Sequence, residues 1–122
     1  DLLLKKGYIL FFSGGTGLPF FSTDTAAAVR ALQIGAQLLV KGTQVDGVYN
    51  RDPRKESPVP LVHYPEVTYT TLLANSLAVM DASAAALCAQ NRLPALVYDA
   101  HVQGNLLGAL QGRIKCSLVR SE

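Results

Sequence analysis

Short apolar runs alternate along the chain with alanine-rich stretches of helical spacing. Residues 8–12 are an apolar, aromatic run without polar alternation, and residues 37–41 are a second run, as in strands that are buried on both faces. Between these runs Ala28 and Ala31 recur at helical spacing after Thr23, which we expect to cap a helix. Strand, helix and strand in this order predict a βαβ unit, and therefore a parallel sheet with flanking helices.

The rest of the chain continues this alternation. We expect, in order, a helix capped by Thr68 that ends near Asn75, a helix over residues 82–90 capped by Asp81, a strand over residues 95–99, a helix over residues 104–111 and a strand over residues 114–119. The predicted fold class is therefore α/β, with three layers in the order αβα and a mainly parallel sheet.

Residues 43–60 interrupt the alternation with three prolines, several charges and the turn signal Asp46-Gly47. We expect a loop here. A long connection without regular structure inside a compact domain usually carries function.

Composition limits the functions to consider. Of the 122 residues, 49% are hydrophobic and 16% are charged, which excludes a disordered chain. The formal net charge of +2 is too small to indicate binding to nucleic acid or to a membrane surface. Two cysteines are too few for a disulfide scaffold, so we expect a cytoplasmic protein. The sequence opens on Asp1, and residues 1–7 are typical of the end of a helix, so we expect a fragment of a longer domain.

A glycine-rich loop follows the first predicted strand, at the sheet edge where α/β proteins bind ligands. Backbone N–H groups of Gly14, Gly15 and Gly17, with the Thr16 hydroxyl, could hold a phosphate or a base edge. The loop is neither a Walker A motif nor a dinucleotide fingerprint, since Phe20 stands where the latter needs a small residue. A tight turn without a ligand is the alternative interpretation. The histidines and cysteines lack paired ligand spacing, so no metal site in the protein is predicted.

Four motifs then follow one another in a specific order. Residues 15–27 read Gly-Thr-Gly-Leu-Pro-Phe-Phe-Ser-Thr-Asp-Thr-Ala-Ala, and residues 40–53 read Val-Lys-Gly-Thr-Gln-Val-Asp-Gly-Val-Tyr-Asn-Arg-Asp-Pro. Residues 77–82 and 91–94 follow, and Gly104-Asn105-Leu106 also fits near the end. This order resembles the bacterial-type UMP kinases of the amino-acid kinase superfamily, over essentially the whole chain. The resemblance implies an incomplete amino-acid-kinase-like fold, with residues 1–122 as its carboxy-terminal nucleotide-binding part.

The resemblance also implies an activity and its residues. The reaction would be ATP + UMP giving ADP + UDP in pyrimidine nucleotide biosynthesis, with ATP as co-substrate, Mg²⁺ carried by the nucleotide and a homo-hexamer as the assembly. Asp24 would be catalytic, orienting the lysines that neutralise the transferring phosphoryl group. The implied ATP contacts are Thr43, Tyr49 and Asp52. The implied UMP-binding residues are Thr16, Gly17, Leu18, Pro19, Phe20, Phe21, Ser22 and Thr23.

The sequence departs from the family at some of these positions. Leu18 stands where asparagine is common, Gln44 replaces a frequent lysine, and Cys116-Ser117 replaces a Gly-Thr pair. The family's amino-terminal half, with a catalytic lysine and most UMP phosphate contacts, has no counterpart here, so the isolated chain is expected to be inactive. Two alternatives stay open: a sister small-molecule kinase of the superfamily, and a non-catalytic nucleotide-binding or storage module of the same fold.

Overall fold

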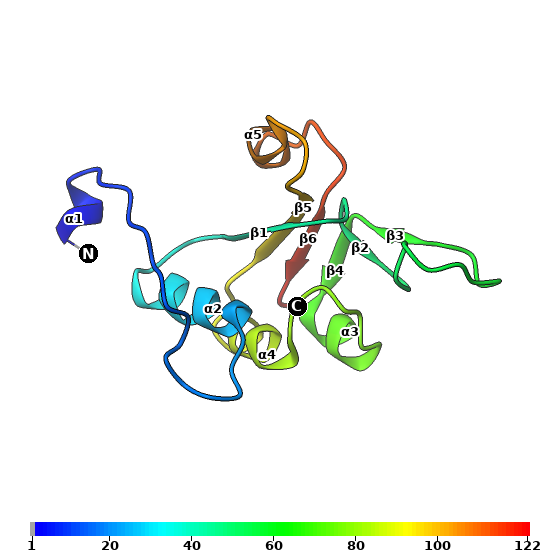
Figure 1. Cartoon of the computed structure of the whole chain (residues 1–122), viewed down its shortest axis with the longest axis horizontal. Helices are drawn as coiled ribbons and strands as arrows, with labels where there is room; N and C mark the ends of the chain where they lie inside the picture. Colours follow the sequence, from blue (N-terminus) through cyan, green and yellow to red (C-terminus); the bar gives the residue numbers. More distant parts are fainter. Residues whose placement is uncertain (1) are drawn as a thin grey trace.

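Helices and short strands alternate along residues 2–122, the part of the chain that the computed structural model describes (Figure 1). In chain order the elements are α1 (Leu2–Lys5), α2 (Thr23–Gln33), β1 (Leu39–Thr43), β2 (Val48–Tyr49), β3 (His63–Tyr64), β4 (Glu66–Thr68), α3 (Tyr69–Ala74), α4 (Ala82–Gln90), β5 (Ala95–Asp99), α5 (Asn105–Leu110) and β6 (Ser117–Arg120). The helix end expected for residues 1–7 is seen in α1, which stops before Gly7 (φ +81°). Asp1 lies outside the described residues.

The main sheet has the strand order β1-β5-β6-β4. β1 runs parallel to β5, with Thr43 opposite Asp99, and β4 runs parallel to β6, while β5 and β6 are antiparallel. Figure 1 shows α2, α3 and α4 on one side of this sheet and α5 on the other. The predicted three-layer α/β architecture with a mainly parallel sheet is therefore confirmed. β2 and β3 form a separate antiparallel hairpin.

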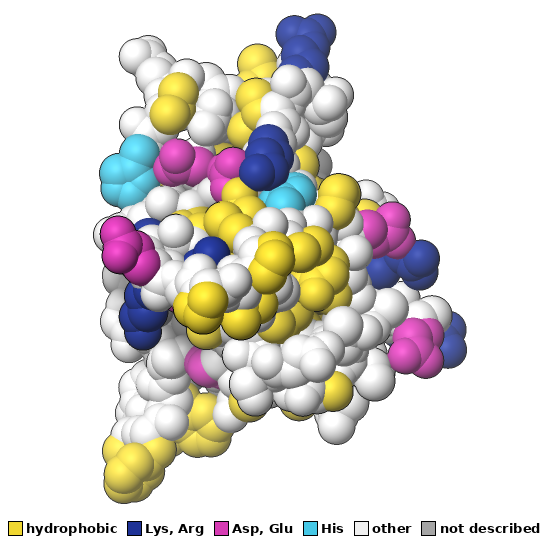
Figure 2. Space-filling model, turned by 90° about the vertical axis from the view of Figure 1, so that its right-hand side faces the viewer, with side chains coloured by type: hydrophobic (Ala, Val, Ile, Leu, Met, Phe, Trp, Pro, Cys, Tyr) yellow, Lys and Arg dark blue, Asp and Glu magenta, His cyan; other side chains and the backbone are white. Residues whose placement is uncertain are grey.

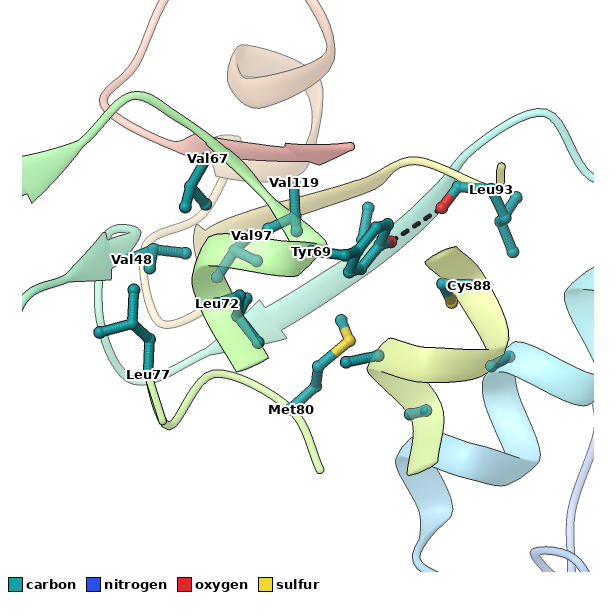
Figure 3. Close-up of a cluster of buried hydrophobic side chains, with 14 of the residues drawn as sticks. Val48, Val67, Tyr69, Leu72, Leu77, Met80, Cys88, Leu93, Val97 and Val119 are labelled. Atoms are coloured by element: carbon teal, nitrogen blue, oxygen red, sulfur yellow. Dashed lines mark hydrogen bonds between the residues drawn. The ribbon is translucent and has the colours of Figure 1, made fainter. Parts of the chain in front are cut away.

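The core lies between the sheet and the layer of α2, α3 and α4 (Figure 3). Tyr69 of α3 is fully buried, and its hydroxyl donates a hydrogen bond to the Leu93 carbonyl at 2.8 Å. α4 packs against α2 through small side chains, among them Ala84, Ala85 and Cys88, which are all fully buried. Small residues let the two helix backbones approach closely, so the alanine richness of the sequence serves helix packing.

The strand predicted for residues 8–12 is wrong. These residues form no strand, and all of their side chains except that of Leu10 are exposed: Ile9 is 83% and Phe11 94% exposed. A strand needs a neighbour to which its backbone can bond, and within residues 2–122 no strand pairs with this segment, which runs apart from the sheet (Figure 1).

The helix cap is also one residue away from its predicted place. The N-cap of α2 is Ser22, not Thr23: its backbone is extended, and its hydroxyl accepts a hydrogen bond from the Asp24 N–H at 3.0 Å. Thr23 is the first helical residue instead. Both residue types can cap a helix, so the sequence could not separate them.

Strand bounds differ at two further places, and three strands were not predicted. The run 37–41 becomes β1 at Leu39–Thr43, and the run 114–119 becomes β6 at Ser117–Arg120. β2 falls inside the predicted loop 43–60, and β3 and β4 follow it; two or three residues are too few to show a periodic pattern. α3, α4 and β5 lie where they were predicted.

The loop between β2 and β3 has exposed apolar side chains near its β3 end. Figure 2 looks at the molecule from the side on which this loop projects, and hydrophobic side chains gather at the centre of that face. Val59, Leu61 and Val62 of the loop are 53%, 42% and 46% exposed. The predicted loop 43–60 therefore contains the short strand β2, and its last part, with the residues that lead into β3, carries apolar side chains on the surface.

Asp81 joins the beginnings of α2 and α4. As N-cap of α4, its carboxylate accepts the Ala84 N–H at 2.7 Å, and it also accepts the hydroxyls of Ser22 and Thr25, the latter at 3.2 Å. Burial acts to raise the pKa of Asp81, but these hydrogen bonds and the charge of Lys41 outweigh it and hold the pKa below its usual range. The two helix ends are thus tied by one ionised carboxylate.

We predict that Asp81→Ala lowers the free energy of unfolding by about 1–3 kcal/mol at pH 7, because three donors lose their acceptor. The folded-state pKa is depressed, so this contribution is present above the unfolded pKa of about 4 and shrinks as the pH falls through the folded value. Urea unfolding of both proteins across this pH range measures the difference. Thr68→Ala, which removes the uncharged cap of α3, is the matched control, and its loss should not change with pH. A pH-independent loss for Asp81→Ala would contradict the prediction.

Candidate functional site

A pocket of about 380 Å³ lies where β1 ends and the chain turns toward β2. Residues 41–45, 47–54 and 76–79 form its walls. Thr43, Tyr49 and Asp52, the three residues singled out for ATP, all line it. The carboxyl end of a parallel strand is the edge at which open α/β sheets bind ligands, so this position suits a ligand site.

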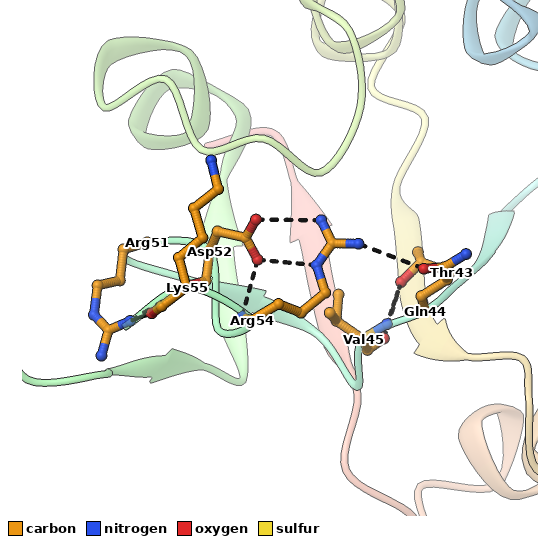
Figure 4. Close-up of polar contacts among 7 residues, drawn as sticks. All are labelled: Thr43, Gln44, Val45, Arg51, Asp52, Arg54 and Lys55. Carbon is orange, nitrogen blue, oxygen red and sulfur yellow. Dashed lines mark hydrogen bonds and ion pairs between the residues drawn. The ribbon is translucent and has the colours of Figure 1, made fainter. Parts of the chain in front are cut away.

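Thr43 shapes the turn out of β1 (Figure 4). Its hydroxyl donates to the Val45 carbonyl at 3.0 Å and accepts the Val45 N–H at 2.9 Å. Both bonds are local, so the side chain holds the backbone of Gln44 at the pocket. The hydrogen bonds of Thr43 therefore serve mainly to shape the wall of the pocket.

Tyr49 of β2 lines the pocket, while its hydroxyl is bonded to residues that do not line it. The hydroxyl donates to the Asp46 carboxylate and accepts from the Lys115 ammonium at 2.8 Å. Burial and the hydrogen bond to Asp46 raise the pKa of Tyr49, so the phenol is neutral at physiological pH. The ring face is the part of Tyr49 that remains for contact with a ligand.

Asp52 is held by Arg54 in a forked pair (Figure 4). Arg54 Nε donates to Oδ1 at 3.0 Å and Nη2 donates to Oδ2 at 3.2 Å, while the Arg54 backbone N–H donates to Oδ1 at 3.0 Å. A carboxylate has about four acceptor positions, so about one remains for a further donor. These bonds lower the pKa of Asp52. Arg54 also reaches Gln44, with Nη1 at 3.4 Å from Oε1, and both residues line the pocket.

Asp24 forms an ion pair with Lys41 beside this pocket. Lys41 Nζ lies 2.5 Å from Asp24 Oδ2, and both side chains are about three-quarters buried, at 24% and 29% exposed. Asp24 is in the first turn of α2, whereas Lys41 comes from β1 and lines the pocket. The pair fixes an ammonium group at the pocket wall, where it can neutralise a phosphate.

The residues singled out for UMP stand in different surroundings. The Thr16 hydroxyl accepts the Leu18 N–H at 3.1 Å and donates to the Leu18 carbonyl at 3.2 Å, which closes a tight turn. Thr16, Leu18 and Phe21 line a second pocket of about 320 Å³ against α2. Gly17, Pro19 and Phe20 are exposed at the loop tip, Ser22 caps α2, and Thr23 borders a neighbouring groove. These residues therefore do not converge on one cavity.

Sequence reasoning missed four side chains at the main pocket or beside it: Lys41, Asp46, His63 and Lys115. Lys41 could have been found, because side chains alternate along a strand and Lys41 therefore shares a face with Thr43. His63 is half-buried, and its Nε2 lies 3.1 Å from Ser117 Oγ. His63 and Lys115 meet this region only through folding, since they are distant from it in the sequence.

Residues 2–122 lack two features that would indicate other kinds of site. They contain no group of three or more His, Cys, Asp or Glu side chains that could hold a metal ion. None of their helices has the length and hydrophobicity to cross a membrane.

Comparison with known proteins gives the family. Residues 1–99 match the amino acid kinase family. The chain belongs to this family. Uridylate kinase from Paramagnetospirillum magneticum is 49% identical to it over 110 residues, which are 90% of this chain and 45% of that protein. Uridylate kinase from Brucella abortus is 45% identical over 116 residues, 95% of this chain and 48% of that protein.

Solved structures agree with this membership. UMP kinase from Ureaplasma parvum has a TM-score of 0.86 at 30% identity, covering 98% of this chain and 49% of that one. UMP kinase from Bacillus anthracis has the same TM-score of 0.86 at 28% identity, covering 98% and 48%. The expected amino-acid-kinase-like fold is thereby confirmed. The chain spans about half the length of the curated relatives it matches.

We predict that Gly47→Ala lowers the free energy of unfolding by about 2–4 kcal/mol. Gly47 is buried with φ +153°, and a Cβ atom there would overlap His63 Nε2 and Ser117 Oγ. Gly14→Ala is the matched control, because Gly14 also has a positive φ (+86°) but has no atom within 4 Å of an added Cβ. The control should lose only the free energy that a residue with a Cβ atom pays for a positive φ, about 1–2 kcal/mol. Equal losses in urea unfolding would show that the pocket wall behind Gly47 is not closely packed.

Proposed function

We propose that the chain is the carboxy-terminal, nucleotide-binding part of a UMP kinase, which transfers a phosphoryl group from ATP to UMP. The observation that carries this proposal is the pocket lined jointly by Thr43, Tyr49 and Asp52, with the ion pair of Asp24 and Lys41 beside it. Relatives named uridylate kinase, 40–49% identical, support it as well.

In this proposal each side chain at the pocket has a physical task. The Tyr49 ring offers a face on which adenine stacks, and the remaining acceptor position of Asp52 takes a ribose hydroxyl. Lys41 faces the phosphates, and Asp24 holds its ammonium in place while charge transfers. Mg²⁺ bound to the ATP phosphates supplies further charge neutralisation. UMP lies against the loop that precedes α2, over residues 16–23.

We predict that Tyr49→Ala weakens MgATP binding to the purified chain by about 1–3 kcal/mol, the scale of one stacked base. Tyr49→Phe keeps the ring and should lose less. Isothermal calorimetry measures both affinities. Tyr8→Ala is the control, because Tyr8 is 59% exposed in the segment that runs apart from the sheet. An unchanged affinity for Tyr49→Ala would place the adenine elsewhere.

We predict that Asp24→Asn reduces turnover about a hundredfold or more in an enzyme assembled from this chain and the amino-terminal half of a uridylate kinase relative. The asparagine keeps the shape of the side chain but no longer fixes Lys41 by charge, so the loss should appear in kcat, with KM values near those of the unchanged enzyme. A coupled ADP-release assay with ATP and UMP measures both constants.

Two controls frame this assay. The chain alone should release no ADP in a UMP-dependent manner, because the resemblance assigns a catalytic lysine and most UMP phosphate contacts to the other half. Calorimetry should meanwhile show that Asp24→Asn leaves ATP affinity nearly unchanged. If the Asp24→Asn enzyme kept the wild-type turnover, Asp24 would have no catalytic role and would only be a residue at the start of α2. An assembled wild-type enzyme that binds ATP but phosphorylates no UMP would instead favour a non-catalytic module.

A further inference from the structure

Lys115 closes a ring of polar contacts around the Tyr49 hydroxyl. It lies between α5 and β6, and its ammonium donates to the Tyr49 hydroxyl at 2.8 Å and lies 3.3 Å from Asp46 Oδ2. The Tyr49 hydroxyl in turn donates to Asp46 Oδ1. Lys115, distant in the sequence, and the neighbouring residues Asp46 and Tyr49 therefore satisfy one another, and the ammonium lies 5.0 Å from the centre of the Tyr49 ring.

A second set of contacts supports the Tyr49 ring itself. The His63 ring packs edge-on against it, with 5.1 Å between centroids and 63° between planes. His63 Nε2 lies 3.1 Å from the hydroxyl of Ser117, which is fully buried, accepts the Val48 N–H at 2.8 Å and donates to the Tyr64 carbonyl at 2.5 Å. The single hydroxyl proton is used on that carbonyl, so His63 is the donor in its contact with Ser117.

Backbone pairing alone constrains this tyrosine weakly. β2 and β3 share only two residue pairs, so the ladder that carries Tyr49 is short. Lys115 and Asp46 are 51% and 42% exposed, so their ion pair contributes little to global stability. What the contacts restrict is the direction of one aromatic ring. Lys115 is not among the residues that line the pocket, but its ammonium contacts Tyr49, which does line it.

We propose that Lys115 is a positioning residue of the nucleotide pocket, which holds the Tyr49 ring in the orientation that stacks on adenine. The inference rests on the proposed function, since it takes the pocket ligand to be an adenine nucleotide. Lys115 touches neither the ligand nor the phosphates. Its effect should therefore be equal for ligands with and without phosphate groups.

The test compares Lys115→Met, Lys115→Arg and the wild-type chain by calorimetry with two ligands, MgATP and adenosine. Lys115→Met should weaken both by about fivefold, the scale of one lost hydrogen bond, and Lys115→Arg should recover most of the affinity. Lys6→Met removes a charge from an exposed position next to α1, far from the pocket, and should change nothing. If Lys115→Met weakens MgATP but not adenosine, Lys115 acts on the phosphates by charge, and the positioning role is wrong.

A second readout needs no ligand. Burial and the charge of Lys115 lower the pKa of His63, against the opposing effect of Asp46. In a proton NMR titration Lys115→Met should therefore raise the His63 pKa, while His101, the other histidine of the chain, serves as an internal reference. A His63 pKa that does not move would show that the ammonium is not held beside this cluster, and would overturn the proposal.

The two proposals fail in different ways. A wild-type chain that binds neither MgATP nor adenosine refutes the proposed adenine site, and the role of Lys115 falls with it. A wild-type chain that binds both, with a Lys115→Met variant that binds both equally well, refutes the positioning role alone.

Discussion

The geometry of the candidate site depends on one carboxylate, that of Asp81. It caps α4 and at the same time accepts the hydroxyls of Ser22 and Thr25, so it fixes where α2 begins. Asp24 lies between these two residues, and the direction of its carboxylate toward Lys41 follows from the same joint. Hydrogen bonds to an ionised acceptor are stronger than neutral ones, which suits a contact that must hold two helix ends at once. The small side chains of α2 and α4 then let the helices pack close behind it.

Beyond this joint, the pocket is built on a turn and a hairpin rather than on long elements, so its side chains need partners to stay in place. The Thr43 hydroxyl closes the turn after β1, Arg54 holds Asp52, and Lys115 holds Tyr49. The Thr43 contact is part of the backbone turn and persists with it. The contacts of Arg54 with Asp52 and of Lys115 with Tyr49 are partly exposed and therefore weak, so they orient side chains more than they stabilise the fold.

How much the sequence could predict depends on whether its signals were local. α3 and α4 were predicted correctly because Thr68 and Asp81 each cap a helix from within its own sequence. The strand predicted at residues 8–12 failed because hydrophobicity shows that a run tends to be buried, but not whether a partner strand is present. Thr43, Tyr49 and Asp52 lie within ten residues of one motif and line the same pocket, while their role as ATP contacts stays a prediction. The contacts of Lys115 with Tyr49 and of Ser117 with His63 join residues more than fifty positions apart, and no pattern in one sequence reveals them.

The charges at the pocket suggest which parts of nucleotide binding and phosphate neutralisation this chain would supply and which would come from the rest of a kinase. Lys41 is paired with Asp24 and Arg54 with Asp52, while the Arg51 guanidinium donates to carbonyls of its own loop, including those of Val59 and Lys55. Two of these three cations are thus largely neutralised by their partners before any polyphosphate arrives, and a bound triphosphate carries several negative charges. In the proposed function, the aromatic and polar groups assigned to adenine lie together in this chain, whereas the cationic groups are too few to neutralise a transferring phosphoryl group alone. In the proposed kinase, the groups that complete this neutralisation would come with Mg²⁺ and from the half of the relatives that residues 1–122 do not match.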